Sequence, residues 1–235
     1  MKAAIIAAGL GERLRDGGIH EPKPLVRICD RPLIDYALSA VAAAGLNDVA
    51  CIVNDLSSGI EDHCRREWPD LRFEFVRRTT PSSMESLFTL APLLGTEPFV
   101  LLTVDAVFAP ALLRDFLAAA ARRLDADGVL AVNRFVDDEK PLWVRMAANR
   151  RITAFGPAAR DSGWVTAGYD VLDPAIFTEI TAARAAQSQA LRVFVAHLLE
   201  RGYGLYAEPV GKSVDVDRVE DIGTAEAFVR SGFTE

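Results

Sequence analysis

Two adjacent segments decide the fold: Ala7-Ala8-Gly9-Leu10-Gly11-Glu12-Arg13-Leu14 and, seven residues further on, Glu21-Pro22-Lys23-Pro24-Leu25-Val26. The first follows residues 3–8, a short apolar run that ends at a glycine and is typical of a buried strand. Glycines in this position let backbone N–H groups approach a phosphate closely. The segments therefore predict a ligand-binding loop at the carboxyl edge of a parallel sheet.

The glycine loop does not match two common nucleotide-binding motifs. A dinucleotide-binding Rossmann loop would have a third glycine where Leu14 stands. A P-loop requires Gly-Lys followed by Ser or Thr, which this loop lacks. Gly211-Lys212-Ser213 occurs later in the chain, but Tyr206 occupies the position of the first glycine of that motif. We therefore expect a phosphate-binding loop of a different kind.

Strand-like and helical segments alternate over the first 128 residues. Apolar runs at 3–8, 49–53, 72–76 and 99–104 indicate strands, and the segments 32–44, 58–68, 84–94 and 109–123 indicate helices. From residue 129 the rhythm changes: 129–133, 142–146 and 151–155 indicate short strands, the last two joined by a turn at 147–150. Further strands are indicated at 164–172 and 205–209, and a helix at 191–201. This succession predicts an α/β protein with a Rossmann-like three-layer α/β/α arrangement and a mixed, mostly parallel sheet. The absence of a linker or repeat predicts a single domain over residues 1–235.

Composition excludes several classes of function. The net charge of −7 and the pI of about 5.1 argue against a dedicated nucleic-acid binder, which needs a basic surface. No run approaches the ~18 apolar residues of a membrane span, and the apolar N-terminus is too short for a signal peptide. Cys29, Cys51 and Cys64 form no C-x-x-C pair, so neither zinc nor a disulfide framework is indicated. We expect a cytoplasmic protein with reduced thiols.

Arg13 and Lys23 are the cations closest in sequence to the glycine loop. Arginine offers a planar fork of donors and lysine a mobile point charge, and both suit a triphosphate. The prolines on either side of Lys23 stiffen the backbone that carries it. By residue type alone, both side chains would be ordinary solvated charges. Their position after the first strand favours phosphate binding.

Carboxylates follow two further strand-like segments. Asp105 comes directly after the apolar run 99–104, where a charge is costly unless it pairs or binds a metal. Asp215 and Asp217 alternate with valines, so on a strand they share one face. The alternatives are that Asp105 caps the helix beginning near Pro110 and that Asp215 faces solvent. Asp221 falls at the start of the last helix and is typical of a first-turn acid.

Residues 1–38 resemble the N-terminus of the nucleotidyltransferase family that makes NDP-sugars and related activated alcohols. The shared signature is an Ala-Ala-Gly-x-Gly-x-Arg-Leu loop followed by Pro-Lys-Pro-Leu-Val. The resemblance implies a GT-A-like nucleotidyltransferase core, with residues 1–128 as the nucleotide-binding half and residues 129–235 as the acceptor-binding half. The implied reaction is Mg²⁺-dependent transfer of NMP from an NTP to a sugar-1-phosphate or an alcohol phosphate such as phosphocholine, with release of pyrophosphate.

The resemblance also implies roles for individual residues. Arg13 and Lys23 would be catalytic, and Asp105 and Asp217 would bind Mg²⁺, with Asp215 a weaker candidate. Gly168, in a segment similar to the family's acceptor-side strand, would bind the acceptor; a strand bulge is the alternative. The nucleotide would be bound by residues of the glycine loop and of the polar loop 79–86, namely Ala8, Gly9, Gly11, Glu12, Ser82 and Ser86.

Some features depart from the family pattern or leave its details open. Glu12 stands where many members have Ser or Thr, and Val104 where they have Gly before the metal-binding Asp. Ser82 or Ser83 is equally a helix N-cap. Lys140 and Lys212 are candidates for the acceptor phosphate, although either is more typical of a surface lysine.

Three other functions remain open at this stage: a GT-A glycosyltransferase that consumes an NDP-sugar, a non-catalytic nucleotide-binding regulatory domain, and an interaction protein. The intact Arg13 and Lys23 motif argues against the first. The expected partners are an NTP and a small phosphorylated metabolite, without nucleic acid or membrane, in a monomer or homodimer.

Overall fold

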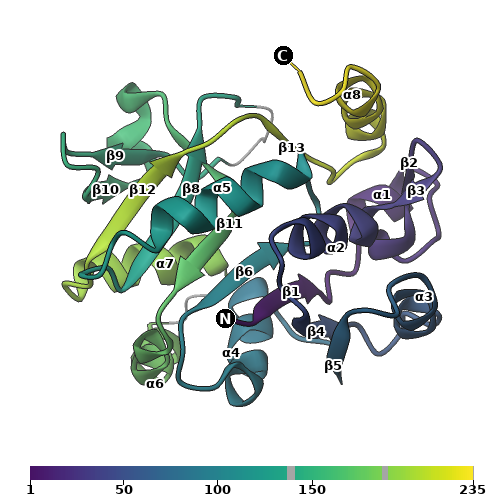
Figure 1. Ribbon diagram of the computed structural model, residues 1–235, viewed down its shortest axis with the longest axis horizontal. Helices are drawn as coiled ribbons and strands as arrows, with labels where there is room; N and C mark the ends of the chain where they lie inside the picture. Colours follow the sequence, from purple (N-terminus) through teal and green to yellow (C-terminus); the bar gives the residue numbers. More distant parts are fainter. Residues whose placement is uncertain (137–140, 187–189, 235) are drawn as a thin grey trace.

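The computed structural model describes residues 1–136, 141–186 and 190–234 and is built on a seven-stranded sheet (Figure 1). The strand order is β12-β8-β11-β6-β1-β4-β5. β11 runs antiparallel to both of its neighbours, and the other adjacent pairs are parallel. The strands are β1 (Ala3–Ala7), β4 (Asp48–Val53), β5 (Arg72–Arg77), β6 (Phe99–Thr103), β8 (Gly128–Asn133), β11 (Val165–Leu172) and β12 (Leu205–Pro209). The expected mixed, mostly parallel sheet is confirmed.

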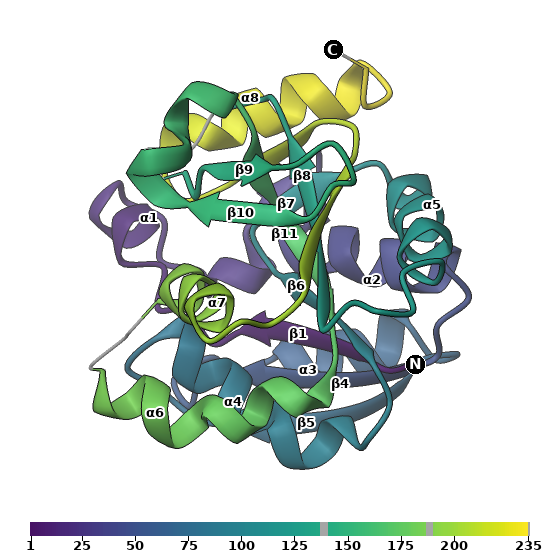
Figure 2. The ribbon, with the colours of Figure 1, turned by 90° about the vertical axis from the view of Figure 1, so that its left-hand side faces the viewer.

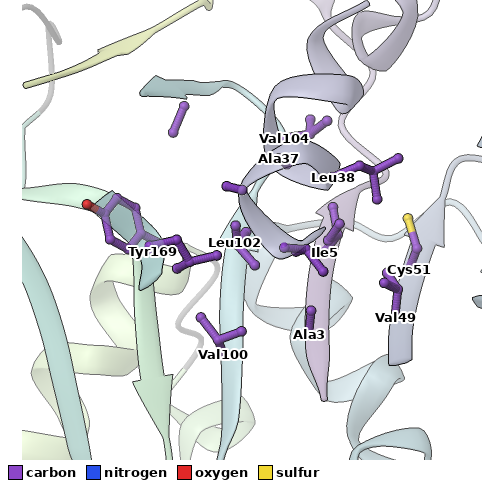
Figure 3. Close-up of a cluster of buried hydrophobic side chains, with 14 of the residues drawn as sticks. Ala3, Ile5, Ala37, Leu38, Val49, Cys51, Val100, Leu102, Val104 and Tyr169 are labelled. Carbon is purple, nitrogen blue, oxygen red and sulfur yellow. The ribbon is translucent and has the colours of Figure 1, made fainter. Parts of the chain in front are cut away.

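Helices cover both faces of the sheet, as Figure 2 shows. One face packs against α2 (Leu33–Ala43), α3 (Ile60–Glu67) and α5 (Pro110–Ala120). The other packs against α4 (Ser83–Leu94), α6 (Ile180–Ala185), α7 (Leu191–Glu200) and the hairpin of β9 (Val144–Met146) and β10 (Ile152–Phe155). Figure 3 shows the first of these layers, in which Ala37 and Leu38 of α2 meet Ile5 of β1. This is the expected three-layer α/β/α arrangement.

The sheet strands are almost continuous apolar runs because both faces are covered. All five residues of β1 are buried, as are four of the five in β6. α2 leads from β1 to β4 on one face, whereas α4 leads from β5 to β6 on the other. The chain thus departs to opposite faces around β1, and such a switch point leaves a crevice at the carboxyl ends of the strands.

Shorter elements close this end of the sheet around a third apolar cluster, which includes Leu14, Val107, Val216 and Phe228. β7 (Ala106–Phe108) pairs antiparallel with β13 (Ser213–Asp215), so Asp215 lies opposite Ala106. The Val216 N–H donates to the Asp105 carbonyl at 3.0 Å. The two acidic segments therefore meet although about 110 residues separate them. The other elements here are α1 (Glu12–Asp16), β2 (Arg27–Ile28), β3 (Arg31–Pro32) and α8 (Val219–Arg230).

Most helices and strands begin and end within a few residues of the positions predicted from the sequence, with some differences. The helix expected over 109–123 ends at Ala120, and the hairpin turn at 147–150 is confirmed. The expectation that Asp215 and Asp217 share a strand is wrong: β13 ends at Asp215, and Asp217 lies in the segment before α8. Short elements, such as α1, α6, β7 and the 3-10 helices η1 (Lys23–Leu25), η2 (Gly156–Ser162) and η3 (Pro174–Glu179), were not predicted.

Candidate active site

The glycine loop leaves β1 and turns into α1 at the crevice. Gly11 is the N-cap of α1 and has φ +62°, a left-handed conformation that favours glycine. A Cβ at Gly11 would lie 3.1 Å from the Cβ of Lys23. On the other side of the loop, Asn54 donates from Nδ2 to the Ala8 carbonyl at 3.1 Å. A glycine at position 11 thus lets the loop pack directly against Lys23.

Lys23 is buried, with 8% of its side chain exposed, and lies between two carboxylates. Its Nζ donates to Asp105 Oδ2 at 2.7 Å and to Asp217 Oδ1 at 2.6 Å. Burial alone lowers the pKa of Lys23, but the two carboxylates outweigh this and raise the pKa above its usual range. Burial raises the pKa of Asp105, whereas the Lys23 charge and hydrogen bond bring it below its ordinary value. Lys23 and Asp105 are therefore both charged at neutral pH.

Arg13 adds a second cation to the same cluster. Its Nη1 donates to Asp217 Oδ2 at 3.1 Å, and 43% of the side chain is exposed. Asp217 is oriented by Asp221, whose Oδ2 accepts from the backbone N–H groups of Asp217 and Arg218 at 2.9 and 2.7 Å. Asp221 lies in the first turn of α8, as expected. The cluster thus holds two cations and two anions at the carboxyl ends of β1 and β6.

A pocket, which we call the glycine-loop pocket, opens beside this cluster with a volume of about 460 Å³. It is lined by the glycine loop, Arg13, Lys23, the loop before α4, and the segment after β6. Ten of the residues that the sequence singled out line it: Ala8, Gly9, Gly11, Glu12, Arg13, Lys23, Ser82, Ser86, Asp105 and Asp217. A deep groove with backbone N–H groups and two cations on one wall suits an anionic ligand of nucleotide size.

The polar loop before α4 both caps the helix and lines this pocket. Ser82 is the N-cap of α4, and its Oγ accepts from the Glu85 N–H at 3.2 Å. Ser86 is buried; its Oγ lies 2.6 Å from Thr80 Oγ1 and donates to the Ser82 carbonyl. Ser83 accepts from the Leu191 N–H at the start of α7. The capping role therefore belongs to Ser82, and Ser83 ties α4 to α7.

A second pocket, the β11 pocket, adjoins the first and has a volume of about 250 Å³. Gly168 and Asp215 line it. Gly168 has φ +86°, and a Cβ there would lie 2.6 Å from the Ala106 Cβ, so only glycine fits. The register between β11 and β8 shifts in this segment. Gly168 therefore lies at a strand irregularity and also forms part of the pocket wall. Ser83, Thr103, Asp105 and Asp217 line both pockets, which therefore meet at the charged cluster.

Asp170 also lines the β11 pocket, although the sequence analysis assigned it no role. It is buried, and burial raises its pKa from 3.8 to about 7, while the Ala131 N–H acts in the opposite direction. The signal in the sequence was a single acid inside the apolar strand Val165–Leu172. Thr80 and Thr103 line the site as well and carried no signal beyond being polar.

The structure also shows where the other residues considered in the sequence analysis lie. Lys212 lies over the rings of Phe135 and Phe228, at 5.4 and 5.5 Å from the ring centroids, and Lys140 falls outside the described residues. Glu12 is exposed in the first turn of α1. Val104 is buried in the layer between the sheet and α2 (Figure 3). Asp105 does not cap α5, whose N-cap is Ala109.

The residues present fit a magnesium ion. Mg²⁺ prefers oxygen ligands and is often bound by one or two carboxylates together with substrate phosphates. Asp105 and Asp217 offer oxygen ligands that converge on the Lys23 ammonium. In the described part of the chain, no group of three or more His, Cys, Asp or Glu side chains is arranged to hold a metal. The donor set thus matches a metal that shares its coordination with a phosphorylated substrate.

The model of the MobA-like NTP transferase domain matches residues 3–201. The chain therefore belongs to this family, which confirms the nucleotidyltransferase resemblance seen in the sequence. Across residues 1–136, 141–186 and 190–234, no helix is long and apolar enough to cross a membrane.

Two characterised proteins illustrate the sequence relationship. The CMP-5'-(3-aminopropyl)phosphonate synthase of Streptomyces rubellomurinus is 31% identical over 159 residues, which is 60% of this chain and 25% of that protein. The bifunctional IPC transferase and DIPP synthase of Rubrobacter xylanophilus is 28% identical over 180 residues, 74% of this chain and 37% of that protein. The chain thus spans well under half the length of these relatives.

Solved structures of the same fold cover the chain almost end to end. The inositol-1-phosphate CTP transferase from T. maritima superposes with a TM-score of 0.81 at 19% identity, covering 100% of this chain and 98% of that one. UDP-glucose pyrophosphorylase complexed with UDP-glucose also gives 0.81 at 19% identity, covering 98% of each chain. These similarities show that the chain has the fold of a nucleotidyltransferase core.

Proposed function

We propose that the protein transfers NMP from an NTP to a small phosphorylated acceptor and releases pyrophosphate. The observation that carries this proposal is that the two pockets meet at Asp105 and Asp217, with Lys23 between them. A reaction between two bound molecules needs two sites whose reacting ends adjoin. The glycine-loop pocket would hold the NTP and the β11 pocket the acceptor.

On the nucleotide side, the backbone N–H groups around Gly9 and Gly11 would bind the phosphates. Arg13 and Lys23 would neutralise the charge that accumulates on the α-phosphate and on the leaving pyrophosphate. Both side chains are already held at this point by their ion pairs with Asp217. An arriving triphosphate would draw the two cations toward itself, which leaves the carboxylate oxygens available.

On the acceptor side, a phosphate oxygen would attack the α-phosphorus in line with the bond to the β-phosphate. A new P–O bond forms, and the α–β bridging bond breaks, its electron pair leaving with pyrophosphate. An acceptor phosphate is largely dianionic at neutral pH, so no general base is needed. Gly168 would let the acceptor lie directly against the β11 backbone.

Asp105 and Asp217 would hold Mg²⁺ together with phosphate oxygens, and Asp215, which ends β13 in the β11 pocket, is the third candidate. Bound there, the ion would neutralise phosphate charge in the transition state. The protein's own contribution is to present the two carboxylates in a fixed orientation, through Lys23 and through the Asp221 cap.

The relatives suggest which substrates to test first. The names of the Streptomyces relative and of the T. maritima structure both refer to cytidine nucleotides, so we propose CTP as the first nucleotide. Sugar-1-phosphates, inositol-1-phosphate, alcohol phosphates such as phosphocholine, and aminoalkylphosphonates form the acceptor panel. An NTP substrate agrees with the cytoplasmic location expected from the sequence, and we propose a monomer or homodimer that needs no nucleic acid or membrane.

Thermal unfolding with ATP, CTP, GTP, UTP and NDP-sugars, each with and without Mg²⁺, tests the proposal. A ligand at one hundred times its dissociation constant stabilises the folded state by ~2.7 kcal/mol, a measurable shift in Tm. We expect a Mg²⁺-dependent shift with one NTP. A shift with NDP-sugars alone would favour a glycosyltransferase, and an NTP shift without turnover of any acceptor would favour a regulatory domain.

A further inference from the structure

Asp170 differs from the other buried acids in the described residues. Three carboxylates are buried there, those of Asp35, Asp170 and Glu179. Asp35 accepts from the Trp68 indole at 2.8 Å and lies 2.9 Å from His63, and Glu179 accepts from Arg201 at 3.1 Å and lies 2.9 Å from His197. The Oδ1 atom of Asp170 is buried without any hydrogen-bond partner. The Ala131 N–H donates to this carboxyl group, but the folded chain supplies no donor to its Oδ1 atom.

The unsatisfied carboxylate belongs to the β11 pocket. Asp170 has 8% of its surface exposed and lines this pocket from the middle of the sheet, opposite Leu101 of β6. Leu101, Leu130 and Val195 line the same region and offer it no donor. An occupant of the pocket that carries N–H groups would supply such a donor.

The distance between the Gly168 end and the Asp170 end of the β11 pocket limits the length of the ligand that fits it. Gly168 lies beside Thr103, whose Oγ1 donates to the Gly168 carbonyl at 3.3 Å, close to the charged cluster around Asp105. Asp170 is two residues further along β11, where it lines the same pocket, and two residues of a strand span about 7 Å. The two ends of the pocket are thus separated by the length of a short alkyl chain.

The charged side chains that line the β11 pocket indicate which chemical group would bind at the end near Asp170. Four carboxylates line the β11 pocket: Asp105, Asp170, Asp215 and Asp217. Lys23 neutralises the end shared with the glycine-loop pocket. Within the described residues, the cation that lines the β11 pocket is Arg192 of α7, an exposed side chain. The end near Asp170 therefore combines an anion with an apolar wall, which favours a cation carried on an alkyl chain.

We propose that Asp170 is the residue that determines acceptor specificity by binding a primary ammonium group joined through a short alkyl chain to the reacting phosphate or phosphonate. This inference rests on the proposed function and names the class of acceptor. The ammonium N–H groups would donate to the Asp170 carboxylate, and the alkyl chain would lie against Leu101, Leu130 and Val195. A quaternary ammonium has no N–H and is normally held by a cage of several aromatic rings, whereas Phe135 is the aromatic residue that lines this pocket in the described residues.

Calorimetric binding to the full chain, with Mg²⁺ and a non-hydrolysable NTP analogue present, tests this directly. The ammonium probes are 3-aminopropylphosphonate and O-phosphoethanolamine; n-propylphosphonate and ethyl phosphate are their matched controls, which lack the ammonium group. We expect each ammonium probe to bind at least about tenfold more tightly than its control. The pair with the larger ratio distinguishes a phosphonate from a phosphate ester. Equal affinities within both pairs would overturn the proposal, as would tighter binding of phosphocholine than of O-phosphoethanolamine.

Two variants separate recognition from a structural role. Asp170→Asn keeps the shape of the side chain but not its charge, and we expect it to lose the preference for the ammonium probes while its affinity for the alkyl controls and for the NTP analogue stays within about twofold. Asp115→Asn, an exposed acid of α5, is the control and should keep the preference. A preference that survives in Asp170→Asn would overturn the assignment.

The proposed function can fail separately. Turnover of a sugar-1-phosphate with equal binding within both probe pairs would overturn the ammonium inference and leave the nucleotidyltransferase intact. Failure to bind any NTP or to release pyrophosphate with any acceptor would overturn the function. In that case the same probe pairs, measured without nucleotide, still decide whether Asp170 binds an ammonium group.

Discussion

Lys23 Nζ lies 2.6 Å from Asp217 Oδ1, although 194 positions separate the two residues in the sequence. The same ammonium group donates to Asp105, so one buried lysine joins the glycine loop, the end of β6 and the segment before α8. These are the three segments from which phosphates and a metal would be bound. The ion pairs therefore hold the proposed catalytic groups together before any substrate arrives.

Replacing Lys23 by methionine should lower the stability of the fold and abolish nucleotide transfer. Asp105 and Asp217, whose side chains are 29% and 39% exposed, would then face each other without the ammonium group between them, and the loss of its charged hydrogen bonds should cost about 1–3 kcal/mol. Urea unfolding at pH 7.5 measures this cost. Arg72→Ala, which breaks an exposed ion pair with Asp48, is the control and should cost clearly less than the Lys23 substitution. Equal costs for the two variants would contradict the buried-cluster account.

Arg13→Ala should separate function from stability. The Arg13–Asp217 pair is half exposed, so its loss should cost no more than ~1 kcal/mol of folding free energy. Because the guanidinium would contact the triphosphate, we expect kcat/KM for the NTP to fall at least about a hundredfold. Steady-state kinetics and urea unfolding on the same preparation test both parts. An unchanged kcat/KM would remove Arg13 from the site.

Gly168→Ala should damage the acceptor pocket more than the fold elsewhere. The new methyl group would meet the Ala106 Cβ at 2.6 Å and would occupy a residue with φ +86°. Gly156→Ala is the matched control, because Gly156 has φ +76° but no atom within 4 Å of its added Cβ. We expect Gly168→Ala to be less stable than the control by ~1–3 kcal/mol and to raise KM for the acceptor but not for the NTP. Indistinguishable variants would mean that the close approach at Gly168 is unimportant.

The stability gained by Asp170→Asn should depend on pH in one direction. Burial raises the pKa of Asp170 from 3.8 to about 7, with the Ala131 N–H opposing this. Below pH 4 the carboxyl is protonated in both the folded and the unfolded chain and costs nothing. Between about pH 4 and pH 7 the carboxyl is ionised in the unfolded chain but still protonated in the folded chain, so the wild type loses up to ~4 kcal/mol over this interval, whereas asparagine loses none.

Urea unfolding of both proteins between pH 5 and pH 8.5, without ligand, measures this difference. The variant should gain relative to the wild type as pH rises and level off above about pH 7. A difference that is the same at every pH would show that Asp170 ionises normally in the folded state.

Long apolar strands and amphipathic helices were predictable because their periodicity spans many residues. The glycine loop, Arg13, Lys23 and Asp105 were also identified from sequence, since each follows β1 or β6. The pairing of β7 with β13 was not, because two three-residue strands about a hundred residues apart leave no periodic signal. The burial of Lys23 was equally hidden, since lysine is normally exposed and its two carboxylate partners come from distant segments.

The most direct test of the account is product analysis by mass spectrometry after incubation with Mg²⁺, CTP or another NTP, and the acceptor panel. The account predicts the acceptor joined to NMP through its phosphate or phosphonate, together with an equal amount of pyrophosphate, from the wild type and from Asp115→Asn, and neither product from Asp105→Asn. Full activity in Asp105→Asn would contradict the proposed metal site. Transfer of a sugar from an NDP-sugar, with no pyrophosphate released from any NTP, would contradict the nucleotidyltransferase itself.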